Sequence, residues 1–434
     1  MEWGILKWRE FMKIKTKDLP YEAVEKIKKP KHKRPKKPNI FFRSLIRALS
    51  VPELLSTRFS WSGDWKDSAG DGPYLILMNH SAFIDLKIAY KIFYPMPFCT
   101  ICTSDGFVGK NWLMRQIGCI PTNTFVTDLT LVTDMLYAVN KLNLSLLMYP
   151  EASYSFDGTA TPLPKGLGKI LKKMKVPVIS VLTDGAFLHN PLYNCLQQRK
   201  TKVTAKVECL LTREEIKEKS VEEIDEILNS AFSFDNFARQ KEQNVHITED
   251  FRADGLHRIM YKCAHCGSEN AMEGKGTTIT CGDCGKSYEM TTLGEIRAID
   301  GETEFSHIPD WYSWERECVR NEIENGEYLL DTEVDIAIMA DHKAIYRVGS
   351  GRLVHNADGF TLTGCDGKLN YKHPVNASYG LYADYYWYEI GDVICIGDNK
   401  RLYYCFPKGK CNVAKTRIAA EEMYKLYSMR KTKV

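Results

Sequence analysis

The chain lacks any long apolar run. Across its 434 residues, no uninterrupted apolar stretch reaches the ~18–20 residues that a helix needs to cross a bilayer. The N-terminus also lacks an apolar segment followed by a small-residue cleavage site, so we do not expect secretion. Hydrophobic residues make up 44% of the chain and charged residues 26%, which is typical of globular proteins. The length predicts two or three domains.

The chain also lacks the cysteine pattern of a disulfide scaffold. Its fourteen cysteines are scattered along a long sequence, which favours a reducing compartment. We therefore expect a cytoplasmic protein. One array stands out, Cys263-x2-Cys266 followed after fourteen residues by Cys281-x2-Cys284. Each pair is followed by a glycine that permits a tight turn, and four thiolates satisfy tetrahedral Zn²⁺ without an open position. The array predicts a zinc ribbon at 255–295 whose metal is structural.

Positive charge is small overall but concentrated in one segment. The formal net charge is +4, yet nine lysines or arginines and one acid, Glu25, lie between Val24 and Arg43. Three prolines there prevent a continuous helix, and an apolar, helix-prone segment, 40–49, follows. Residues 1–50 are thus predicted to hold the protein on an anionic membrane surface, at about 1 kcal/mol per basic residue. We expect a peripheral protein at the inner face of the membrane. A solvated linker is the alternative, and nucleic-acid binding is disfavoured because no aromatic residue interleaves the basic run.

The middle of the chain has the pattern of an α/β domain. Between 71 and 184, short apolar strands (74–79, 98–103, 144–149 and 176–182) alternate with helical periods (about 83–93, 110–117 and 128–142). An acidic, helical and mostly exposed stretch follows at 213–240. We place this domain at 51–245.

The last third of the chain has an all-β pattern. Past residue 295, short alternating or aromatic-rich segments are separated by Gly, Asp and Asn turns. A helix is expected at 415–427. Seven or eight strands closed by a helix resemble a pleckstrin-homology domain in shape, and we place this β-rich domain at 305–434.

A histidine and a carboxylate follow the first of the buried strands. His80 comes directly after strand 74–79, and Asp85 lies five residues further on. A carboxylate bonded to one ring nitrogen fixes the tautomer and stabilises the imidazolium, and the other nitrogen can then take a proton from a hydroxyl. The pair is a candidate general base.

Three further segments follow His80-x4-Asp85 in a fixed order. They are Pro150-Glu151-Ala152-Ser153-Tyr154-Ser155, then Lys165-Gly166, then the apolar strand around Val176-Pro177-Val178. This series resembles the sequence blocks of the glycerophospholipid acyltransferases, the family of 1-acylglycerol-3-phosphate acyltransferase, over about residues 40–230.

The resemblance implies an enzyme that moves a fatty acyl group to a hydroxyl of a (lyso)glycerolipid, with 1-acylglycerol-3-phosphate as the default acceptor. The donor would be acyl-CoA or acyl-carrier-protein, the latter also a possible partner. His80 would be the general base and Asp85 would hold its ring, while backbone N–H groups near a helix that begins at Ser81 would stabilise the oxyanion. The residues that the resemblance assigns to substrate binding are Glu151, Ser153, Ser155, Lys165 and Gly166.

Two departures from the family pattern concern the acceptor. Thr124 and Tyr154 stand where the family has arginines, its phosphate ligands, and a guanidinium binds phosphate best. Lys165 could hold a phosphate as a point charge. A lysophospholipid, glycolipid or other neutral hydroxyl remains an alternative acceptor. A different class of function also stays open, a catalytically weak protein that binds lipids or acyl carriers and recruits partners through the ribbon and the β domain.

Overall fold

The computed structural model describes residues 13–432 apart from 127, 165 and 410. The α/β domain is built on a seven-stranded sheet in the order β2-β8-β7-β3-β6-β4-β5. Strands β3 to β7 run parallel, and β8 is antiparallel to β7. The strands are β2 (Ser60–Ser62), β3 (Leu75–Met78), β4 (Phe98–Thr103), β5 (Cys119–Thr122), β6 (Ser145–Met148), β7 (Val178–Asp184) and β8 (Thr204–Leu211).

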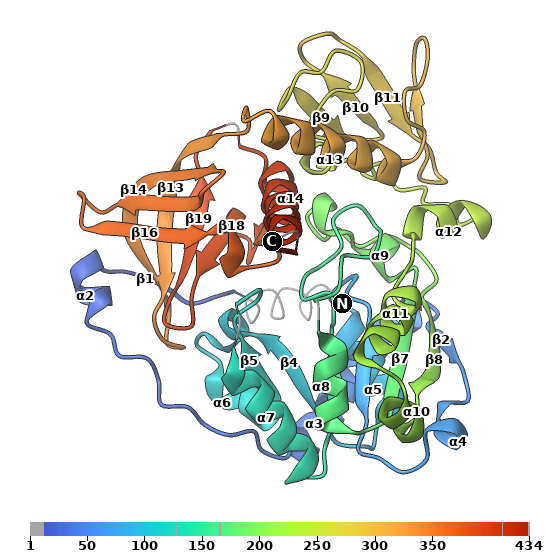
Figure 1. The fold of residues 1–434 in the computed structure, drawn as a ribbon. Helices are drawn as coiled ribbons and strands as arrows, with labels where there is room; N and C mark the ends of the chain where they lie inside the picture. Colours follow the sequence, from blue (N-terminus) through green and yellow to red (C-terminus); the bar gives the residue numbers. More distant parts are fainter. Residues whose placement is uncertain (1–12, 127, 165, 410, 433–434) are drawn as a thin grey trace.

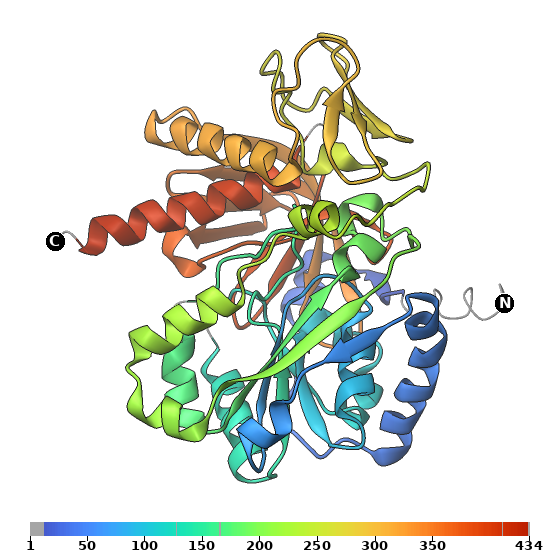
Figure 2. The ribbon, with the colours of Figure 1, turned by 90° about the vertical axis from the view of Figure 1, so that its right-hand side faces the viewer.

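Helices cover both faces of this sheet (Figure 2). Successive residues of β3 point to opposite faces: Ile76 and Met78 join one apolar core and Leu75 and Leu77 the other. The predicted α/β domain is thereby confirmed. The first core involves α3 (Ile40–Ser56), α4 (Trp65–Ala69) and α5 (Asp85–Phe93), and the second involves α7 (Leu129–Asn140), α8 (Leu167–Met174), α10 (Arg213–Glu218) and α11 (Val221–Ala231). The remaining short helices are η1 (Ser104–Phe107), α6 (Asn111–Gln116), α9 (Ala186–His189), η2 (Leu192–Asn194), α12 (Asn236–Glu242) and η3 (Leu256–Arg258).

The N-terminal arm contacts the C-terminal sheet and then continues into the α/β domain. Strand β1 (Thr16–Asp18) pairs with the C-terminal sheet, α2 (Tyr21–Glu25) follows, and residues 26–39 then run without a helix to α3 (Figure 1). Arg115 donates to the carbonyl oxygens of Lys33 and Arg34 at 3.1 and 2.7 Å, which holds the basic segment to the domain. The predicted boundary at residue 50 falls inside α3, which packs against α5. Membrane contact by this arm stays a prediction.

The cysteine-rich region forms a separate four-stranded antiparallel sheet. Its strands are β9 (Met272–Lys275), β10 (Thr278–Cys281), β11 (Ser287–Met290) and β12 (Ile296–Ala298). A long helix, α13 (Ile308–Glu324), follows where the sequence predicted only β structure. Ile308, Trp311 and Val319 of this helix are buried at helical spacing, so its periodicity was present but was masked by its many charged residues.

The C-terminal region contains one antiparallel sheet in the order β16-β15-β14-β13-β19-β18-β17, closed by helix α14 (Val413–Thr432). The all-β prediction for the strands and the terminal helix is confirmed, and the pleckstrin-homology analogy stays a prediction. Residues 345–356 form one long strand, β14. The strands are β13 (Leu330–Met339), β14 (Ile345–Asn356), β15 (Gly359–Gly364), β16 (Leu369–Pro374), β17 (Tyr382–Trp387), β18 (Gly391–Gly397) and β19 (Leu402–Pro407), with a short turn η4 (Val375–Ala377).

Among the helices that the structure describes, none is both long and apolar enough to span a bilayer.

Candidate active site at the carboxyl edge of the sheet

The candidate base and its carboxylate lie at the carboxyl end of β3. His80 Nδ1 is 3.1 Å from Asp85 Oδ2. That oxygen also accepts from the backbone N–H groups of Ser81 and Ala82, at 2.8 and 3.1 Å. Asp85 is 1% exposed, so its carboxylate is fixed by the turn that it closes. Because the contact to Asp85 uses Nδ1, Nε2 is the nitrogen able to take a proton.

The same hydrogen bonds correct the prediction for the oxyanion. The helix begins at Asp85 and not at Ser81, since the intervening residues form the turn around the carboxylate. The N–H groups of Ser81 and Ala82 are bound to Asp85 and do not face a substrate.

Two tyrosines hold the imidazole between them. The ring centroid of His80 is 4.0 Å from that of Tyr149 and 4.0 Å from that of Tyr154, and both pairs are stacked. Burial raises the pKa of each tyrosine well above its ordinary value, so both phenols stay neutral. Tyr149 follows β6, and the sequence analysis assigned it no role. Tyr154, at the position of a family arginine, contributes an aromatic face and no cation.

Glu151 fastens the loop after β6 to the loop after β3. Its Oε1 accepts from the backbone N–H of His80 at 3.2 Å. Its Oε2 accepts from the hydroxyl and the N–H of Thr161, at 2.8 and 3.3 Å. Burial raises the pKa of Glu151 to about 7. Both oxygens are therefore occupied within the protein, and the residue lies where it can position His80.

The other predicted substrate-binding residues are less close to the imidazole. The hydroxyl of Ser155 donates to Thr159 O at 2.6 Å and its N–H to His80 O at 3.3 Å. Ser153 is buried and its hydroxyl accepts a hydrogen bond from the C-terminal domain. Gly166 has φ +85° at the start of α8, a conformation that favours glycine. The prediction for Lys165 lies outside the described residues. Thr124 is buried, and it makes no hydrogen bond with His80 in the described part of the chain.

The C-terminal domain covers this edge of the sheet. Asp105, which follows β4, accepts from Tyr382 Oη at 2.8 Å and from Trp387 Nε1 at 3.2 Å, both on β17. The ring of Phe156 packs against that of Tyr385, with centroids 4.6 Å apart. The same region contains Asp384, whose pKa burial raises to about 8. No local sequence signal pointed to these contacts.

Comparison with known proteins identifies the domain that contains this geometry. Residues 56–184 match the Acyltransferase family model. The chain thus contains an acyltransferase domain. The matched segment contains His80, Asp85 and Glu151, and it ends at the end of β7. By structure, the acyltransferase is similar to PlsC from Thermotoga maritima, a 1-acyl-sn-glycerophosphate (LPA) acyltransferase. Identity is 18%, the TM-score is 0.36, and the alignment covers 44% of this chain and 77% of that chain.

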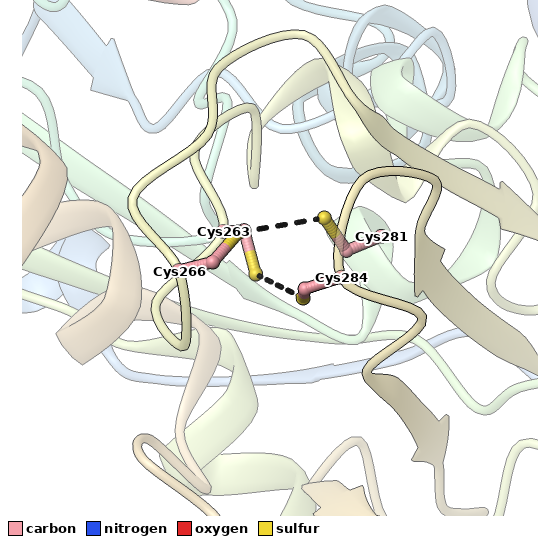
Figure 3. Close-up of side chains that lie close together, drawn as sticks. All are labelled: Cys263, Cys266, Cys281 and Cys284. Carbon is pink, nitrogen blue, oxygen red and sulfur yellow. Dashed lines mark hydrogen bonds between the residues drawn. The ribbon is translucent and has the colours of Figure 1, made fainter.

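The four array cysteines of the acyltransferase meet at one point (Figure 3). The sulfurs of Cys263 and Cys284 are 3.8 Å apart, as are those of Cys266 and Cys281, and all four lie within 4.8 Å of one another. Four sulfurs at ~2.3 Å from a tetrahedral Zn²⁺ are ~3.8 Å apart, so the cluster could hold one metal ion. His265 binds Glu304 at 3.0 Å and is not part of the cluster.

Proposed function

We propose that this enzyme transfers a fatty acyl group from a thioester donor, acyl-CoA or acyl-carrier-protein, to a hydroxyl of a lysoglycerolipid, with His80 as the general base. The contact of 3.1 Å between His80 Nδ1 and the buried Asp85 Oδ2 carries the proposal. It holds the ring so that Nε2 can accept the hydroxyl proton, and it stabilises the imidazolium that forms.

The chemistry needs no covalent enzyme intermediate. As Nε2 takes the proton, the acceptor oxygen attacks the thioester carbonyl. Collapse of the tetrahedral intermediate breaks the C–S bond, and the imidazolium returns its proton to the departing thiolate. Glu151 acts by fixing the backbone of His80, and Tyr149 and Tyr154 hold the imidazole plane. A ring held in one orientation keeps its lone pair directed at the hydroxyl, which is the geometric requirement for a positioned base.

A non-phosphorylated acceptor head group is favoured by Tyr154. In the described part of the site, the groups around His80 are tyrosines and the carboxyls of Asp85 and Glu151, with Asp105 and Asp384 nearby. An ionised carboxylate repels a phosphate, and a neutral phenol supplies no cation to bind one. Lysophosphatidate remains the second candidate, since Lys165 stands at the family's lysine position.

We also propose membrane contact through α3. Phe41 is 65% and Leu55 70% exposed on this helix, and Trp112 of α6, 65% exposed, lies against Phe42. An apolar helix face next to a basic arm matches an interfacial anchor. The ribbon metal is proposed to be Zn²⁺, held by the four thiolates and structural.

The test is acyl transfer from acyl-CoA and from acyl-carrier-protein to a panel of acceptors: lysophosphatidate, glycerol 3-phosphate, neutral lysolipids and glycolipids. Each pair is run with the wild type, His80→Ala and a control, His246→Ala, which removes an exposed histidine. Loss of a general base lowers the rate by about 100-fold or more, and the control should stay at the wild-type rate. Activity retained in His80→Ala would refute the assignment. No product from any pair, together with binding to lipid vesicles, would favour the lipid-binding alternative.

A further inference from the structure

A buried arginine from the C-terminal helix reaches the third family block. Arg417 of α14 is 3% exposed. Its Nη2 donates to Ser153 Oγ at 2.9 Å, and its Nη1 donates to Tyr154 O at 3.2 Å. The guanidinium also lies over the ring of Phe156, 4.4 Å from the centroid. Figure 1 shows α14 between the C-terminal sheet and the acyltransferase half.

Its position is fixed from the other side as well. Nε of Arg417 donates to Glu421 Oε1 at 3.1 Å, one turn along α14. Glu421 also accepts from Arg316 of the neighbouring helix α13 at 2.8 Å, and the two helices run side by side in Figure 2. Lys415 of α14 bonds both carboxylate oxygens of Glu269, at 2.9 and 2.7 Å. Glu421 and α13 thus hold the guanidinium, and the cysteine-rich region holds the first turn of α14 through Lys415.

The loop that Arg417 binds, residues 153–155, also contacts His80. Tyr154 stacks on the imidazole, and Ser155 donates its N–H to His80 O. Ser153 and Tyr154, which are adjacent in the chain, therefore both accept hydrogen bonds from the guanidinium. The ring of Tyr154 stacks on His80.

We propose that Arg417 is a positioning residue for His80, supplied to the active site by the C-terminal domain. The role rests on His80 being the base proposed above. Arginine suits it because the planar guanidinium donates in two fixed directions, here to a side-chain oxygen and to the backbone oxygen of the next residue. A lysine has one nitrogen and no such fork. The C-terminal domain is then part of the catalytic unit and not only an accessory.

The experiment compares Arg417→Met, Arg417→Lys and a control, Arg320→Gln, in the full chain. Arg320 of α13 binds Glu422 of α14 at 3.0 Å, so the control removes an ion pair from the same helix interface without touching the loop. We expect kcat of Arg417→Met to fall about tenfold or more, with the KM values of donor and acceptor within about twofold, because a misplaced base slows chemistry more than binding. Arg417→Lys should recover part of the loss, and Arg320→Gln should keep the wild-type kcat.

A second arm keeps the proposal testable if Arg417→Met fails to fold. Ser153→Ala deletes one acceptor of the guanidinium and should lower kcat about threefold. When it is combined with Arg417→Lys, the loss in kcat should be smaller than the product of the two single losses, because the effects of residues that act as one unit are not additive. Fully multiplied losses would overturn the proposal, as would a wild-type kcat in Arg417→Met. A kcat loss in Arg417→Met while His80→Ala stays active would overturn both the role and the assignment of the base. A kcat loss in Arg417→Met while His80→Ala is inactive supports both.

Discussion

Replacing Glu151 by glutamine should make the stability of the acyltransferase less sensitive to pH. The carboxyl is 1% exposed, and burial raises its pKa from an ordinary 4.5 to about 7. Between these two pH values the native protein keeps a proton that the unfolded chain has released. Wild-type stability therefore falls as pH rises through this window, because the folded state must bury a charge. A glutamine carries no charge at any of these pH values, and its amide oxygen can still accept from the N–H of His80.

The size of the effect follows from the shift. One pKa unit corresponds to about 1.4 kcal/mol, so the full penalty above pH 7 is about 3 kcal/mol. Of this, about 2.5 kcal/mol develops between pH 5 and pH 8. Replacing Oε2, which accepts from Thr161, by an amide nitrogen adds an offset in the variant that does not vary over this range.

The assay is urea unfolding of wild type and Glu151→Gln at pH 5, 6, 7 and 8, followed by the fluorescence of tryptophans such as the buried Trp65. We expect the variant to gain about 2.5 kcal/mol relative to the wild type from the lowest to the highest pH. The control, Glu208→Gln, removes an exposed carboxylate from strand β8 of the same sheet and should leave the pH dependence as it is. A difference between wild type and Glu151→Gln that stays flat over this range would refute the reasoning. It would mean that the hydrogen bonds to Glu151 outweigh its burial.

Two further predictions concern the ribbon and the arm. Cys281→Ser, or prolonged exposure to a strong chelator, should remove one bound Zn²⁺ per chain and lower the midpoint of thermal unfolding, because the binding energy of a structural metal contributes to folding. Cys318→Ser, outside the cluster, should change neither the metal content nor the midpoint. An unchanged metal content in Cys281→Ser would argue against the site. The double variant Phe41→Asp, Leu45→Asp should bind anionic vesicles about tenfold more weakly or worse. The control is Leu129→Asp, which should bind as the wild type does, because Leu129 is 79% exposed on the opposite face of the sheet. An equal loss of binding in both variants would exclude α3 as the membrane contact.

The strands of the first half could be predicted where burial alone decides them. All four residues of β3 are buried, and β4 begins and ends at the predicted residues. The missed strands lie where burial is partial. Strand β8 carries exposed Lys206 and Glu208 on its outer face, and the three residues of β2 are exposed. A strand that is exposed on one face, like β8, or that lies at the edge of the sheet, like β2, carries fewer apolar residues, so its sequence has a weaker pattern.

The contact between His80 and Asp85 could also be predicted, because both partners lie within six consecutive residues. A local turn brings His80 and Asp85 together, and the sequence contains the whole turn. Arg417 and Ser153 are 264 positions apart. Their contact depends on how two domains pack, and nothing in the sequence next to Arg417 distinguishes it from any other arginine on a helix. The same holds for Asp105 and its two donors on β17.

The arginine that reaches the third block does not replace the missing phosphate ligands. Each nitrogen of the Arg417 guanidinium already donates within the protein, to Glu421, Tyr154 and Ser153, and the residue is 3% exposed. A ligand for a head group must be reachable from the site, and this one is not. Position 154 itself is occupied by a ring that stacks on the base. A phosphate acceptor would therefore have to be bound by a cation other than Arg417. Tyr154 and Arg417 thus both serve to hold His80 in place. The acceptor must be recognised by other residues.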